Sequence, residues 1–144
     1  MDFLPYPIFA ILCIYYEQED FMAIQTLKRC PCNGDNLERF IQPIILIILS
    51  HGSCSGYSVV KQLAAYPLLQ NSPPDTTGVY RQLKQMEEKG SIAALNYPDE
   101  NGKLKKHYQI TADGLNCLAN WSQTLIDYRT NITMLLDDIE EVIS

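Results

Sequence analysis

The chain has 144 residues, 47% of them apolar and 19% charged, so it accommodates one globular domain with one appended segment and excludes a second independent core. Seventeen acidic against 11 basic side chains give a net charge of −6, which excludes indiscriminate coating of nucleic acid or anionic membrane and leaves only a local basic patch. Five cysteines without a repeated framework favour reduced thiols, and so a cytoplasmic protein, over a disulfide-bonded secreted domain.

The N-terminal segment is apolar but too short to cross a membrane. Phe3 to Tyr16 is uncharged and contains two prolines, but it has only 14 residues, whereas a spanning helix needs about 20. Acidic residues lie on both sides of it and no basic residue precedes it, which is unlike a secretory signal. We expect neither membrane insertion nor export.

Residues 1–21 carry four acids and no base, and without them the charge is −2, from 13 acidic and 11 basic side chains. Codons available for Gln18 to Met22 include an AGGAGG ribosome-binding sequence just before the Met22 codon. This predicts that the native chain starts at Met22. The alternative is that Phe3 to Tyr16 folds as an extra helix against a dimer.

Turn-forming residues from Arg29 to Asp35 predict a loop that holds the only closely spaced cysteines, Cys30 and Cys32. A structural zinc site commonly uses four ligands in paired C-x-x-C arrangements, and this sequence lacks that pattern. We therefore expect no cofactor and no metal. The alternative is a redox or metal site in which Cys30 and Cys32 join His51, Cys54 or a partner subunit.

A central helix is expected after the loop. Asn36 can cap it, Phe40 to Leu49 is apolar almost all round, and Pro43 either kinks the helix or marks its start.

The small and polar residues from Gly52 to Gly56 end this helix, and a second, short helix is expected beyond them. Its apolar positions recur at helical spacing: Tyr57, Val60, Leu63 and Ala64.

A third helix is expected from Asp75 or Thr76, as its cap, to Lys89, with Gly90 as its stop. One face carries the apolar residues Val79, Leu83 and Met86. The other face carries Thr76, Thr77, Tyr80, Arg81 and Lys84. We expect the first face to pack and the second to bind.

A β-hairpin follows. Ser91 to Tyr97 is apolar-rich, Pro98 to Gly102 is a turn cluster, and Lys103 to Ile110 alternates as a returning strand.

A last helix, capped by Thr111, is expected from about Ala112 to the C-terminus. Its apolar residues follow a heptad spacing: Leu118, Trp121, Leu125, Tyr128, Ile132, Leu135, Ile139 and Val142. The alternative is that this helix packs within its own chain. A small winged core cannot cover it beyond Tyr128, so a homodimer about a two-fold axis is expected.

This order predicts a mainly α chain with a small β-hairpin wing, which is a winged helix-turn-helix with a long C-terminal dimerisation helix. The expected parts are an N-terminal extension with a cysteine-containing loop (1–35), the winged domain (36–111) and the dimerisation helix (112–144).

Three motifs resemble the PadR family of bacterial transcriptional regulators. They are Gly56-Tyr57, the stretch from Thr77 to Gly90 with its Thr-Gly-Val-Tyr-Arg-Gln-Leu opening, and Lys106 to Gly114, in a consistent order within residues 40–118. Many members have His where this chain has Ser55. The segment Cys30-Pro-Cys-Asn-Gly34 is similar to a subset that includes polyhydroxybutyrate-responsive regulators.

The resemblance implies a dimeric repressor that binds double-stranded promoter DNA and is released by an effector that varies within the family. A two-fold dimer matches a pseudo-palindromic site. Operator, regulated genes and effector are not specified by the sequence.

The residues expected to contact DNA are Thr76, Thr77, Tyr80, Arg81 and Lys84 on the third helix and Lys103, Lys105, Lys106 and His107 on the wing. Hydroxyls and main-chain N–H groups at a helix start suit phosphates, arginine can read a guanine edge, and wing lysines attract the backbone. The alternative is that these are ordinary solvated faces, and that Tyr80 is half-buried.

An enzyme is not expected, because the chain has no phosphate-binding glycine loop, no H-E-x-x-H and no G-x-S-x-G. Two alternatives to a DNA-binding repressor stay open. One is a winged-helix module that binds protein and never DNA, which fits the acidic total charge. The other is a cysteine-based redox-responsive or metal-responsive regulator.

Overall fold

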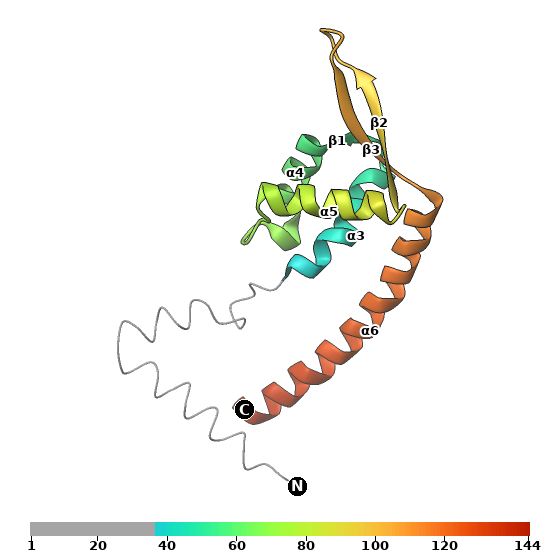
Figure 1. Ribbon diagram of the computed structural model, residues 1–144. Helices are drawn as coiled ribbons and strands as arrows, with labels where there is room; N and C mark the ends of the chain where they lie inside the picture. Colours follow the sequence, from blue (N-terminus) through green and yellow to red (C-terminus); the bar gives the residue numbers. More distant parts are fainter. Residues whose placement is uncertain (1–36) are drawn as a thin grey trace, which may run out of the picture. The chain divides into compact units, whose positions relative to one another are not determined.

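The computed structural model describes residues 37–144 (Figure 1). In chain order the elements are η2 (Leu37–Phe40), α3 (Ile41–Ser50), β1 (Cys54–Ser55), α4 (Gly56–Ala65), η3 (Pro67–Leu69), α5 (Thr76–Glu88), β2 (Ile92–Pro98), β3 (Leu104–Ile110) and α6 (Ala112–Ile143). Residues 37–129 form one compact unit, the winged unit, and residues 130–144 belong to a second. The expected fold class, a mainly helical winged helix-turn-helix with a hairpin wing and a long C-terminal helix, is confirmed.

Helix α3 is the centre of the winged unit and contacts α4, α5 and β3. Seven of its ten residues are buried, as its apolar composition predicts: Ile41, Pro43, Ile44, Ile45, Leu46, Ile48 and Leu49. Pro43 is the third helical residue, where an N–H has no partner within the helix, so it marks the helix start. Phe40 occupies the cap position without a side-chain bond, and the expected cap Asn36 lies outside the described residues.

Helix α4 has a buried face that only partly matches the expected one. Its buried residues are Gly56, Val59 and Leu63. Of the four positions expected on the apolar side, Leu63 is buried and Val60 packs against the core, whereas Tyr57 and Ala64 are exposed, so the expectation was wrong for these two. The buried side is set by packing, since α4 contacts α3 and α5 and the ring of Tyr80 lies against Gly56. The helix starts at Gly56, where the hydroxyl of Ser55 accepts from the Ser58 N–H at 3.2 Å.

The sheet has a third strand that the sequence does not signal. The order is β1-β3-β2, with Cys54 opposite Tyr108 and Ser55 opposite His107. A two-residue strand is too short to show a period. The same limit applies to η3, whose Leu69 is buried.

Helix α5 begins and ends where expected. The carboxylate of Asp75 accepts from the Gly78 N–H at 3.3 Å, and Gly90 follows the helix with φ +82°, which suits glycine. Val79, Leu83 and Met86 are fully buried against the core.

Strands β2 and β3 form the expected hairpin, paired from Ile92↔Ile110 to Pro98↔Leu104. Asp99 closes the turn, since its Oδ1 accepts from the N–H groups of Asn101 and Lys103 at 2.9 and 2.8 Å. Near the core Ile92 and Tyr108 are buried. Farther along, the hairpin extends into solvent above α5 (Figure 1).

Helix α6 is attached tightly to the turn between α5 and β2. The hydroxyl of Thr111 donates to the Gly90 carbonyl at 2.6 Å and accepts from the Gly114 N–H at 3.1 Å. The Thr111 N–H donates to the Ser91 carbonyl at 3.2 Å. A Cβ added at Gly114 would collide with that same Ser91 oxygen, so glycine is required there. These contacts explain why threonine and glycine occupy positions 111 and 114.

Candidate nucleic-acid interface

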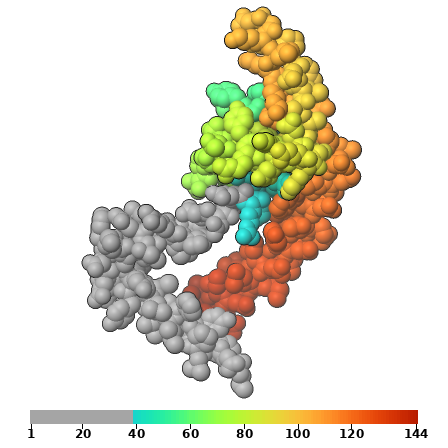
Figure 2. Space-filling model, in the orientation of Figure 1, coloured from blue at the N-terminus to red at the C-terminus, as the bar shows by residue number. Residues whose placement is uncertain are grey.

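The polar face of α5 is exposed along its whole length. Its members are the five residues singled out from the sequence: Thr76, Thr77, Tyr80, Arg81 and Lys84. They lie opposite the buried row that holds α5 on the core. In Figure 2 the surface of α5 and the projecting hairpin lie on the same visible face of the winged unit. We call this face of α5 the reading face.

Tyr80 is partly covered by α4. It is 42% exposed, and a Cβ added at Gly56 would lie 2.5 Å from its Cε1 and 3.2 Å from its hydroxyl. The ring therefore lies on the bare backbone at the start of α4, and only part of it is free.

The three wing lysines do not lie together. Lys105 pairs with Tyr97 and Lys106 with Asn96, and adjacent residues of a strand point to opposite faces. Lys103 precedes the strand. All three are exposed, but they do not form one basic patch.

Lys106 forms an ion pair with α5. Its Nζ lies 3.1 Å from Glu87 Oε2 and 5.3 Å from the centre of the Tyr108 ring. The hydrogen bond to Glu87 is the main cause of the raised pKa of Lys106, so the amine stays charged. The sequence did not predict this partner.

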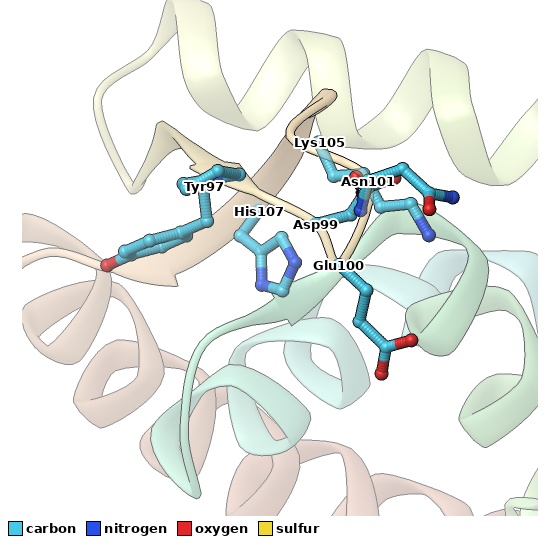
Figure 3. A pocket seen from close by; sticks show the side chains of 7 residues that line it. Tyr97, Asp99, Glu100, Asn101, Lys105 and His107 are labelled. Atoms are coloured by element: carbon cyan, nitrogen blue, oxygen red, sulfur yellow. Dashed lines mark hydrogen bonds between the residues drawn. The ribbon is translucent and has the colours of Figure 1, made fainter.

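The other face of the wing carries a hollow near its tip. Its walls include Tyr97, Lys105 and His107 together with turn residues (Figure 3). The rings of Tyr97 and His107 meet edge to face, with centres 5.3 Å apart. His107 is half-buried, so only a part of it is accessible. Asp99 and Glu100 line the same hollow and add negative charge at the tip.

Helix α4 contributes two exposed residues that the sequence analysis does not predict as site residues. Tyr57 is 63% exposed, and Lys61 Nζ lies 4.8 Å from the centre of its ring. The ring of Tyr80 on Gly56 places the start of α4 beside the reading face. The signal was a Tyr followed by a Lys four residues later, which share a helix face.

Charge is distributed unevenly along the chain. Residues 37–129 carry nine basic and eight acidic side chains, whereas residues 130–144 carry four acidic ones and no base. The acidic total of the chain therefore does not describe the winged unit.

The cysteines of the described part do not form a site. Cys54 and Cys117 are free and half-buried, and burial raises the pKa of the Cys54 thiol. No group of three possible metal ligands occurs among residues 37–144. Cys30 and Cys32 lie outside this range. His51 is exposed, and its Nδ1 is 2.8 Å from the Ile47 carbonyl at the end of α3.

The heptad residues of α6 divide into two groups. Leu118 and Trp121 pack against the core, and the indole N–H of Trp121 donates to Gln42 Oε1 at 3.0 Å. The remainder are exposed: Leu125, Tyr128, Ile132, Leu135, Ile139 and Val142. Among the described helices, none has the length and apolar character that crossing a bilayer requires.

Residues 45–120 match the sequence model of the transcriptional regulator PadR-like family. A PadR-like transcriptional regulator from Bacillus cereus is 24% identical with a TM-score of 0.60, over 69% of this chain and 94% of that chain. A PadR family transcription regulator from Clostridium difficile is 24% identical with a TM-score of 0.56, over 67% and 98%.

Bacillus subtilis PadR, solved in complex with operator DNA, is 26% identical with a TM-score of 0.51. The match covers 58% of this chain and 46% of that chain, so it spans less than half of the Bacillus subtilis protein. No curated protein matches the sequence.

Proposed function

Because the chain belongs to the PadR-like family of transcriptional regulators, we propose that it represses transcription by binding a pseudo-palindromic promoter site as a homodimer. This family consists of DNA-binding proteins without enzymatic activity, and family membership confirms the expectation that the chain is not an enzyme.

The observation that carries the proposal is the exposed reading face of α5 within a winged helix-turn-helix. Such a helix enters the major groove, and the hairpin lies on the flanking backbone. The operator complex of Bacillus subtilis PadR supports DNA as the ligand of this chain as well.

The residues of the reading face have separate roles in the proposal. Arg81 reads a base edge, because its planar guanidinium can donate two hydrogen bonds to guanine. Lys84 and the hydroxyls of Thr76 and Thr77 hold phosphates. Tyr80 contributes its uncovered edge.

On the wing, Lys103 and Lys105 supply attraction to the DNA backbone that does not depend on sequence. Tyr57 and Lys61 on α4 extend the contact to a neighbouring phosphate, because the first helix of such a motif crosses the backbone.

A homodimer through α6 is supported by its exposed apolar residues. Leu125 is 38% exposed and Ile132 59% exposed, and a continuous heptad row of this kind is stable in water when a second helix covers it. The two-fold symmetry of the dimer then presents two α5 helices to two half-sites about 34 Å apart.

Repression, release by an effector and a cytoplasmic location complete the proposal. The alternative of a module that binds only protein relied on the acidic total charge. The winged unit carries nine basic against eight acidic side chains, so this argument no longer favours the alternative.

Selection of bound duplexes from a random-sequence library tests the proposal. We expect wild-type protein to enrich a two-fold repeat, and a reporter gene preceded by that repeat to be expressed less when the protein is present. Absence of any enriched sequence contradicts DNA binding, and increased expression contradicts repression.

A further inference from the structure

We propose that Lys106 is a positioning residue for DNA binding: its ion pair with Glu87 fixes the angle between wing and reading helix, and it does not hold a phosphate. This inference rests on the proposed DNA-binding function and assigns to Lys106 a role different from that of Lys105.

The first support is where the hairpin leaves the core. Ile92 and Tyr108 are buried. Farther out, Asn96 pairs with Lys106, and the residues from 96 to 106 are exposed, apart from the half-buried Asp99. We call residues 96–105 the outer wing. It has no packed side that would hold its direction relative to α5.

The second support is the ion pair itself, which lies where the outer wing begins. Glu87 is in the last turn of α5, and Lys106 is the first residue of the core-facing row of β3 beyond Tyr108. In the described chain, this 3.1 Å contact is the outermost hydrogen bond or ion pair that joins the hairpin to another element. It connects the residue next to the outer wing to the helix that carries Arg81.

The third support is that Lys106 already forms an ion pair, whereas Lys103 and Lys105 form none among the described residues. Its Nζ is held by Glu87 and also lies over the Tyr108 ring, and both contacts are on the α5 side of the sheet. Glu87 would repel any phosphate that approached this amine. Lys103 and Lys105 have no ion-pair partner among the described residues, so they are the wing cations available to DNA.

Five variants separate positioning from phosphate binding: Lys106→Gln, Glu87→Gln, the double glutamine variant, the charge exchange Glu87→Lys with Lys106→Glu, and Lys105→Gln as the matched control. The probe is a labelled duplex that the wild-type protein enriches from a random library. Affinity is measured across a range of salt concentrations. Circular dichroism checks that each variant is folded.

If Lys106 positions the wing, Lys106→Gln and Glu87→Gln each weaken binding about twofold to fivefold per half-site, as expected for loss of an exposed ion pair. The double variant is no weaker than either single one, and the charge exchange restores most of the affinity. The dependence of log K on log salt stays as in wild type. Lys105→Gln instead lowers that slope by about 0.9 per subunit.

The inference is overturned if Lys106→Gln lowers the salt slope as Lys105→Gln does and the charge exchange binds no better than Lys106→Gln. Hydrogen exchange without DNA gives an independent result. We expect outer-wing amides to exchange faster in both single glutamine variants and at the wild-type rate in the charge exchange, and equal rates in all proteins overturn the positioning role. If wild type enriches no duplex, the proposed function fails, while these exchange rates still decide whether the ion pair holds the wing.

Discussion

The ring of Tyr80 on α5 lies against the backbone of Gly56 at the start of α4, so that a Cβ added at Gly56 would be 2.5 Å from Tyr80 Cε1. Residues 24 positions apart thus set how closely the two helices of the helix-turn-helix approach each other.

A double-mutant cycle tests this contact. We expect Gly56→Ala to lower the free energy of unfolding by about 1 kcal/mol, because the Tyr80 ring must move off α4. In a Tyr80→Ala background the same change is expected to be neutral or stabilising by up to about 1 kcal/mol, since alanine favours a helix. Urea denaturation measures both. Equal effects in the two backgrounds would contradict the contact.

The attachment of α6 gives a second prediction. Gly114→Ala is expected to lower the free energy of unfolding by about 1 to 3 kcal/mol, because the added methyl meets the main-chain oxygen of Ser91, which cannot rotate away. Asn116→Ala, at an exposed position of the same helix, is the matched control and should not destabilise the protein. Thermal and urea unfolding measure the stability of both variants, and equal stabilities would contradict the predicted contact of Gly114 with Ser91.

The third prediction concerns dissociation of the proposed dimer by charges placed on α6. Leu125→Asp combined with Ile132→Asp places four carboxylates in the paired helices, and each buried unpaired charge costs several kcal/mol, which is enough to dissociate a dimer. Ala119→Asp combined with Met134→Asp adds the same charge on the outer side of the heptad and should leave the dimer intact. Sedimentation equilibrium distinguishes them, and an unchanged dimer in the first variant would argue against α6 as the interface.

The reading face and the wing should respond differently to truncation. Arg81→Ala is expected to cost about 1 to 3 kcal/mol of binding and to relax preference at one base pair per half-site. Lys103→Ala combined with Lys105→Ala should weaken all duplexes similarly and flatten the salt dependence by roughly one unit per lost phosphate contact. If both variants bind the enriched duplex like wild type at every salt concentration, α5 and the wing are not the DNA-contacting surface.

The half-buried thiol of Cys54 predicts how the stability of the fold changes at alkaline pH. Burial raises its pKa above the ordinary value of 9.0, so the folded chain holds this proton more tightly than the unfolded chain does. The stability due to this group is complete below about that pH and is lost as the pH rises through the folded-state pKa. Cys54→Ala should therefore lose less unfolding free energy than wild type between about pH 8 and pH 10. Equal losses of unfolding free energy in the two proteins would show that Cys54 does not contribute to the pH dependence of stability.

Local signals in the sequence predicted α5 and the hairpin well. Asp75 caps the start of α5 with its side chain, and Gly90 ends the helix because its backbone adopts a positive φ. The turn at residues 98–102 is held by hydrogen bonds to the side chain of Asp99, which is part of that turn. The expected buried side of α4 was only partly right, because the side that is buried depends on how α4 packs against α3 and α5, and the ring of Tyr80 on Gly56 is a long-range contact that the spacing within α4 does not encode.

The site was less predictable for a physical reason. The ion pair between Lys106 and Glu87 joins residues 19 positions apart, and it depends on the hairpin register and on the direction of the sheet relative to α5. Neither quantity is encoded in the charge pattern of one segment. From the sequence alone Lys105 and Lys106 are therefore expected to act together, although the pleat of β3 places them on opposite faces.

The hydrogen bonds of Thr111 to Gly90, Ser91 and Gly114 connect the end of α5 directly to the start of α6. In the proposed dimer α6 then works as a lever on the reading helix. Tyr128 lies 16 residues beyond Ala112, or about 24 Å along the helix, so a turn of about 5° at the root displaces it by about 2 Å. Shifts of that size at subunit interfaces are typical of allosteric transitions. If the proposed dimer forms, we expect a molecule that alters how its two α6 helices cross to rotate both α5 helices without contacting the DNA.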